Sequence, residues 1–256
     1  MPDTRSHRGA HPRDAELFGE DGVAVLRRAV DDLSWLLDRG YPVKAAAALV
    51  GDRHTLRTRQ RKAVRRCAAA AIAVAERLAR RVEPVAMAGR GLEIDGYNVL
   101  LTVEAALGGG VVLRGRDGCC RDMAAMSRHY KRVEETLRAL ELLGGWLASH
   151  EIAPVRWFFD RPVSNSGRLR ASMLELAATR RWPWSVDLVA DPDKVLVRSD
   201  AVIATADSAV LDAPVAWLDL ARHVVADCVP SAWTVDLGWR GDLGWRGDLG
   251  WRGDLG

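Results

Sequence analysis

Leu92-Glu93-Ile94-Asp95-Gly96-Tyr97-Asn98-Val99 is the segment that most clearly indicates the fold, because a short apolar run ends there on an aspartate and a glycine. Such a run is typical of a buried strand. Comparable runs follow at residues 110–113, 154–160, 186–189, 201–205 and 215–218. Helical periodicity separates most of them, over residues 122–149 and 164–181 above all.

This alternation of strands and helices predicts an α/β domain over residues 86–228, with a mainly parallel sheet covered by helices on both faces. Residues 111–113 have a second interpretation as one arm of an antiparallel hairpin. The chain of 256 residues is long enough for this domain and one small accessory domain.

The accessory domain is predicted over residues 20–85, as a helical module with helices at 21–38, 43–50 and 56–81. Helix, short turn and basic helix is also the outline of a helix-turn-helix. The last helix presents one strongly positive face, which could bind the phosphates of a nucleic acid or simply face solvent. Its candidate phosphate-binding residues are Arg57, Arg61, Lys62 and Arg65.

The two ends of the sequence differ from the rest in composition. Residues 1–19 are polar and rich in charge, which predicts a disordered leader. Residues 229–256 carry an Asp-Leu-Gly-Trp-Arg-Gly repeat, whose glycines prevent a stable helix, so we expect a flexible tail. The alternative for the repeat is a multivalent Trp/Arg segment that contacts bases or a partner.

Bulk composition indicates a cytoplasmic protein without a membrane span. No apolar run approaches the roughly 20 residues that a membrane helix needs. The four cysteines show neither zinc-ligand spacing nor a disulfide pattern. The net charge of +3 predicts no polyanionic partner by itself, because the distribution of charge matters more.

Carboxylates flank several of the predicted strands. Asp95, Asp160 and Asp207 follow strands, Asp200 precedes one, and Glu104 lies a helical turn or two beyond Asn98. Because ligands bind at the carboxyl ends of parallel strands, we expect Asp95, Asp160, Asp200 and Asp207 to converge. Each aspartate alone is equally compatible with a helix cap or a turn. Asp117 and Asp122 lie in a glycine-rich loop nearby.

Clustered carboxylates repel one another and persist mainly around a hard cation. Oxygen ligands favour magnesium or manganese, so we predict a Mg or Mn site on those four aspartates. A bound ion would orient water for attack on a phosphodiester. No Walker motif, GxSxG or HExxH segment supports other hydrolase chemistry.

The segment from Pro162 to Arg168 follows a predicted strand and opens a helix, which is a geometry that binds phosphate. The candidate residues are Ser164, Asn165, Ser166 and Arg168. The alternative is a Ser or Asn helix cap with an arginine that faces solvent.

The opening strand at 92–99 resembles that of PIN-like and NYN nuclease domains, and Ala204-Thr205-Ala206-Asp207 resembles their late strand followed by an aspartate. Over about residues 31–225 the chain is similar to an uncharacterised prokaryotic family. That family pairs an N-terminal domain of unknown function 434 with a PIN-like or NYN-like domain of unknown function 5616. The likeness lies in residues 39–42, 50–53, 94–98, 160–170 and 199–212.

This resemblance implies a PIN-like three-layer α/β/α sandwich and metal-dependent cleavage of RNA rather than DNA. It places Asp95, Glu104, Asp200 and Asp207 on the family's acidic, catalytic positions. Between Asp95 and Asp200 the completing residue is open among Glu104, Asp117, Asp122 and Asp160.

The leading hypothesis is therefore a Mg- or Mn-dependent ribonuclease whose helical module adds affinity for phosphates. A noncatalytic nucleic-acid-binding protein with an incomplete metal site is the rival. A third hypothesis is an enzyme that acts on small phosphorylated molecules.

Overall fold

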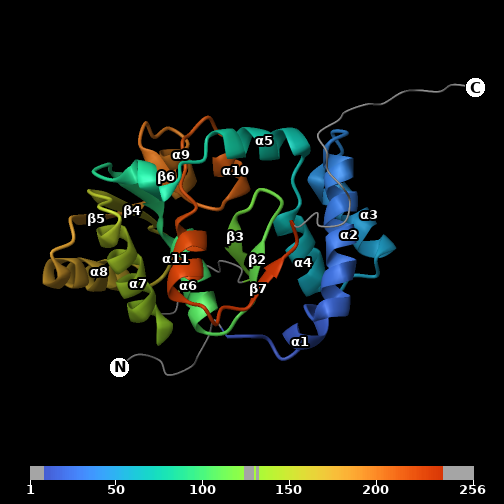
Figure 1. Ribbon diagram of the computed structural model, residues 1–256, viewed down its shortest axis with the longest axis horizontal. Coiled ribbons are helices and arrows are strands. Elements are labelled where there is room, and N and C mark those ends of the chain that lie inside the picture. The colour runs from blue at the N-terminus through green and yellow to red at the C-terminus, as the bar shows by residue number, and fades with distance from the viewer. Residues whose placement is uncertain (1–8, 124–129, 131–132, 239–256) are drawn as a thin grey trace, which may run out of the picture.

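The computed structural model describes residues 9–123, 130 and 133–238, and Figure 1 shows their arrangement. The predicted tail repeat from residue 239 onward and the first eight residues of the predicted leader lie outside these residues. No helix in the described part of the chain is long and apolar enough to cross a membrane.

A four-stranded parallel sheet forms the centre of the α/β domain. Its order is β5-β4-β1-β6, with β1 at Leu92–Asp95, β4 at Val155–Asp160, β5 at Trp184–Val189 and β6 at Val202–Ala204. In β1, Ile94 lies opposite a residue of β4 on one side and of β6 on the other. The predicted α/β class with a mainly parallel sheet is confirmed.

Helices cover both faces of this sheet. In β4, Trp157 belongs to one apolar cluster and the next residue, Phe158, to another, because successive side chains of a strand point to opposite faces. The first face packs against helices α6, α7, α8 and α11, at Gly96–Leu107, Glu135–Ser149, Ser166–Arg180 and Leu220–Cys228. The second packs against the short helices α9 and α10, at Pro192–Leu196 and Ser208–Leu211.

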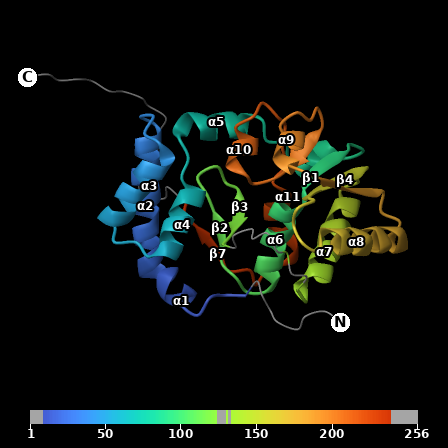
Figure 2. The same ribbon diagram turned by 180° about the vertical axis from the view of Figure 1, so that it is seen from behind.

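A second sheet, β3-β2-β7, lies between the α/β domain and the N-terminal helices in both ribbon views (Figures 1 and 2). Strand β2, Val112–Arg114, pairs antiparallel with β3, Cys120–Asp122, so the hairpin interpretation of residues 111–113 is confirmed. It pairs in parallel with β7, Thr234–Asp236. The boundary predicted at residue 229 is therefore too early, because β7 is anchored by this pairing.

The N-terminal helices are α1 to α5, followed by the 3-10 helix η1, at Asp14–Leu17, Glu20–Leu37, Val43–Arg53, Thr58–Cys67, Ala71–Ala79 and Pro84–Met87. Helices α1 to α4 share an apolar core with the small sheet, in which Leu33 and Val64 meet Leu113 and Val235. Each helix of the module is too short to bury enough surface alone, so the small sheet completes its core.

Four further predicted segments differ from the structure. The helix expected at 56–81 divides into α4 and α5, and the helix expected at 122–149 begins at Glu135. The strand expected at 215–218 contributes only isolated bridges at Trp217. The leader expected to be disordered through residue 19 contains α1, whose Leu17 and the following Phe18 are buried.

The division of the long basic helix has a local cause. Ala68 and Ala70 adopt extended backbone, with ψ of 142° and 146°, which ends α4 and precedes α5. The carboxylate of Asp38 then accepts a hydrogen bond from the backbone N–H of Ala71, at 2.5 Å from Oδ1 to N. This hydrogen bond satisfies a backbone N–H at the start of α5 that has no acceptor within the helix.

Two neighbouring glycines of α7 give a test of this packing. A Cβ added to Gly144 would lie 2.1 Å from the Trp182 ring, whereas one added to Gly145 meets nothing within 4 Å. We expect Gly144→Ala to lower the free energy of unfolding by about 1–3 kcal/mol through overpacking. Gly145→Ala should be neutral or raise it by about 0.5–1 kcal/mol through helix propensity. Urea unfolding of both variants measures the difference, and equal effects would contradict this packing.

Candidate acidic site at the sheet edge

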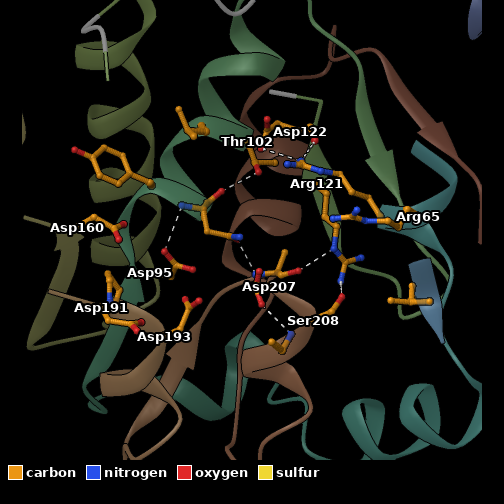
Figure 3. Close-up of a pocket in the computed structure, with 18 residues that line it drawn as sticks. Arg65, Asp95, Thr102, Arg121, Asp122, Asp160, Asp191, Asp193, Asp207 and Ser208 are labelled. Atoms are coloured by element: carbon orange, nitrogen blue, oxygen red, sulfur yellow. Dashed lines mark hydrogen bonds and ion pairs between the residues drawn. The ribbon is translucent and has the colours of Figure 1, made fainter. Parts of the chain in front are cut away.

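A cavity of about 690 Å³ opens at the carboxyl ends of the parallel strands. Six aspartates line it. Figure 3 shows Asp95, Asp160, Asp191 and Asp193 on one side with Asp207 beside them, and Asp122 lies apart from these five. Three of the five, Asp95, Asp160 and Asp207, are residues that the sequence predicted to converge.

The strand ends place these carboxylates. Asp95 ends β1 and caps α6, and Asp160 ends β4. Asp191 follows β5 and caps α9, with Asp193 in the first turn of that helix. Asp207 follows β6 and caps α10. Asp95 and Asp207 each both cap a helix and line the cavity, and three of the four predicted carboxylates converge, without Asp200.

Polar side chains between β1 and β6 hold this edge together. The Thr205 hydroxyl donates to Asp95, at 2.9 Å from Oγ1 to Oδ2, and the backbone N–H of Asp207 donates back to that hydroxyl oxygen at 3.1 Å. The amide oxygen of Asn98 accepts from the backbone N–H of Ala206 at 2.7 Å. The positions of Asp95 and Asp207 are thus coupled.

Burial and mutual repulsion disfavour the charged state of this wall. Burial raises the pKa of Asp95 to about 7, and the charge of Asp193 adds to the effect. Burial, together with the charges of Asp207, Asp191 and Asp160, raises the pKa of Asp193 to about 6. Burial also raises the pKa of Asp160. A hydrogen bond from Lys194 lowers the pKa of Asp191 instead.

The opposite wall of the cavity is basic. It contains Arg65 and Arg66 from α4 and Arg121 from β3 (Figure 3). Arg121 donates to both carboxylate oxygens of Asp117, at 2.8 and 2.6 Å, and from Nε to the carbonyl oxygen of Ala206 at 2.8 Å. The guanidinium group is therefore held rigidly where it meets the cavity.

Asp117 is a structural anion rather than a cavity residue. It is buried between Arg121 and Arg77, whose Nη1 lies 2.7 Å from its Oδ2. Burial would raise the pKa of Asp117, but the charges and hydrogen bonds of the two arginines lower it to about 2.

Two predicted acidic residues lie outside the cavity. Glu104 is fully buried, and its Oε1 accepts hydrogen bonds from the Tyr130 and Thr136 hydroxyls at 2.5 and 2.6 Å. Asp200 is exposed and precedes β6, so it lies toward the amino edge of the sheet, away from the other carboxylates. Asp122 does line the cavity, but it is in contact with Arg66.

The predicted phosphate loop also lies outside the cavity lining. The Asn165 amide donates to the carbonyl oxygen of Tyr130 at 3.0 Å, and Asn165, at the N-cap position of α8, makes no side-chain cap hydrogen bond. Ser166 is buried, whereas Ser164 and Arg168 are exposed. The arginine facing solvent agrees with the alternative interpretation of this segment.

Most of the predicted basic face is used within the protein. Arg61 pairs with Asp52 at 2.7 Å, and Lys62 donates to the carbonyl oxygen of Met123 at 2.7 Å. Burial lowers the pKa of Lys62 to about 8. Arg57 is exposed at the start of α4 and does not line the cavity. Of the four predicted phosphate-binding residues on this helix, only Arg65 reaches the cavity.

Sequence reasoning missed Asp191 and Asp193 on the acidic wall and Arg121 on the basic wall. The signal for the aspartates was present, because both follow the strand predicted at 186–189. Arg121 had no such signal, because its position depends on a hairpin that folds back toward β6.

The aspartate wall suits a hard cation, because its possible metal ligands are carboxylate oxygens whose negative charges repel one another. Among the described residues, no three His, Cys, Asp or Glu side chains stand close enough together to share one ion. Magnesium commonly uses one or two carboxylates and keeps several waters, so the donors present fit such an ion. The four cysteines are free.

The fold and the cavity define an α/β protein with an acidic site at the carboxyl edge of a parallel sheet. The family described as Domain of unknown function (DUF5616) matches residues 84–223, more than half of the chain, and the chain belongs to it. The family described as Protein of unknown function (DUF434) matches residues 25–80. The predicted pairing of these two domains is confirmed.

The chain is also similar to the uncharacterized protein MJ0935 of Methanocaldococcus jannaschii. The two are 27% identical over 188 residues, which are 73% of this chain and 88% of that protein. No solved structure matches the chain.

The raised pKa of Asp95 predicts how stability depends on pH. The folded state binds the Asp95 proton more tightly than the unfolded chain does, so stability falls as pH rises from about 4 through 7. We expect Asp95→Asn to flatten this slope and to raise the free energy of unfolding at pH 8 by on the order of 1–3 kcal/mol. Thermal unfolding of the wild type and of Asp95→Asn at pH 5 and pH 8, with a chelator present, measures this pH dependence. A wild-type slope retained in the variant would contradict the assignment, and Asp200→Asn is the control.

Proposed function

We propose that the protein is a Mg- or Mn-dependent hydrolase that cleaves phosphodiester bonds in RNA. The observation that carries the proposal is one cavity with an aspartate wall facing an arginine wall. An anionic ester that bridges a cation on the first wall and arginines on the second would be neutralised from both sides. RNA rather than DNA is proposed because the opening strand and the Ala204–Asp207 element resemble PIN-like and NYN domains.

Asp95 and Asp207 would hold the ion together with waters, and Asp193 and Asp160 lie on the same wall. A bound Mg or Mn would lower the pKa of a water and stabilise negative charge on the leaving oxygen. Asp160, whose pKa burial raises, can accept a proton from water near neutral pH. Arg121, held by Asp117, can donate to a phosphate oxygen without reorganisation.

A second candidate substrate class is a small phosphorylated molecule. The observation in its favour is that Arg59, Arg61 and Lys62 contact protein groups instead of forming one open basic track along α4. A long strand would find few phosphate contacts outside the cavity, and such contacts supply much of the affinity for nucleic acid.

Substitutions on the two edges of the sheet test the proposed site. We expect Asp95→Asn and Asp207→Asn each to reduce Mn-dependent cleavage of a single-stranded RNA by roughly 100-fold or more, because each removes a charge that would hold the ion. Asp200→Asn should leave cleavage unchanged, since Asp200 lies toward the opposite edge. Initial rates on a labelled oligonucleotide measure all three.

Cleavage that survives in Asp95→Asn and Asp207→Asn would overturn the proposal. RNA binding without divalent metal and without cleavage would favour the noncatalytic nucleic-acid-binding alternative. Hydrolysis of small phosphate esters with RNA left intact would favour the second substrate class. Loss in Asp200→Asn alone would favour the family resemblance over the geometry.

A further inference from the structure

We infer that Arg65 forms a second phosphate subsite in the cavity, so that the preferred ligand is a nucleoside unit with phosphates on both its 3′ and 5′ sides. This inference rests on the proposed function, because it assumes that the first phosphate lies at the aspartate wall. It adds the number and spacing of the phosphates that the site recognises.

Arg65 differs from the other two arginines of the basic wall. Arg121 is held by Asp117, and Arg66 donates to the carbonyl oxygen of Asp122 and lies near its carboxylate. Arg65 is exposed, lines the cavity, and has no hydrogen bond or ion pair with any residue in the described ranges. It is therefore a cation whose charge is available to a ligand.

Arg65 and the aspartate wall lie on different sides of the cavity. Figure 3 shows Arg65 across the cavity from Asp160, Asp191 and Asp193, on the same side as Arg121. A phosphate at the aspartate wall and another at Arg65 would thus belong to different parts of one ligand. The cavity of about 690 Å³ falls within the range of about 300–1,000 Å³ that is usual for sites of small molecules.

The backbone that carries Arg65 is anchored close to the site. Lys62 donates to the carbonyl oxygen of Met123, and Arg66 donates to that of Asp122, so residues on either side of Arg65 in α4 are tied to β3 and its continuation. Arg61 donates to the carbonyl oxygen of Leu56 at 2.9 Å, which ties the helix to its own entry segment. The module therefore presents Arg65 to the cavity at a defined position.

Three nucleotides give a direct test of the second phosphate subsite in the full chain. Calorimetry in excess magnesium would compare adenosine 3′,5′-bisphosphate with the two adenosine monophosphates, 3′ and 5′. The bisphosphate carries the two phosphates that flank one nucleotide of an RNA strand, and it contains no diester for the proposed activity to cleave. We expect the wild type to bind it roughly tenfold more tightly than either monophosphate, as one added charge-assisted contact implies.

The Arg65→Ala variant should lose this preference while its affinity for the monophosphate at the aspartate wall stays within about twofold of the wild type. Arg57→Ala is the matched control, because Arg57 is an exposed arginine on the same helix that does not line the cavity. It should retain the full preference. Circular dichroism of both variants would verify that α4 is intact.

Three results would overturn the inference. They are equal wild-type affinity for one and two phosphates, a preference that survives in Arg65→Ala, and an equal loss in Arg57→Ala, which would indicate general attraction. A phosphate preference that depends on Arg65, in a protein that cleaves no RNA, would support the subsite and refute the ribonuclease. The two proposals can therefore fail separately.

Discussion

The buried carboxylate of Asp117, between the guanidinium groups of Arg77 and Arg121, joins the two halves of this protein. Arg77 belongs to α5, in the helical region. Arg121 belongs to β3 and to the basic wall of the cavity. All three side chains are at most 7% exposed. Replacing Asp117 would leave Arg121 buried without its carboxylate, and removing one partner of a buried ion pair costs about 3–5 kcal/mol. The placement of the helical module against the α/β domain depends on this contact.

The same contact determines how the two walls of the cavity face each other. Arg121 also donates to the carbonyl oxygen of Ala206, the residue before Asp207. Through that bond the basic wall is tied to the end of β6, and Thr205 and Asn98 extend the connection to Asp95. A displacement of Arg121 would therefore move residues of both walls.

The sequence predicted the acidic edge well where an apolar run leads directly into an aspartate. Asp95, Asp160 and Asp207 follow strands that were recognised, and the parallel topology brings their ends together. Asp200 was assigned wrongly because it precedes its strand, and a residue at the amino end of a parallel strand lies at the other edge. Glu104 was assigned by resemblance, but its carboxylate is turned into the core.

The predicted helix and strand boundaries were wrong where tertiary contacts override the local conformational preference of the sequence. Nothing in the alanine-rich residues 68–70 predicts a break, and the break persists because Asp38 caps the new helix from another element. Strand β7 could not be predicted either, since its three residues form a strand only by pairing with β2, more than a hundred residues earlier. Helical periodicity likewise continues N-terminal to Glu135, but the pairing of β2 with β3 withdraws Asp122 from that helix.

The composite cavity gives a physical reason for one chain to contain both families. The DUF5616 region contributes the wall of aspartates and Arg121 on the facing wall. Burial above all, and then the charges of neighbouring aspartates, raise the pKa values of Asp95 and Asp193. The DUF434 region adds Val43, Arg65 and Arg66 to the lining and so places positive charge on the facing wall. Neither region encloses the cavity without the other. An acidic wall that destabilises the folded state is retained most readily where a ligand offsets its charge, and the basic wall supplies the complementary half of that site.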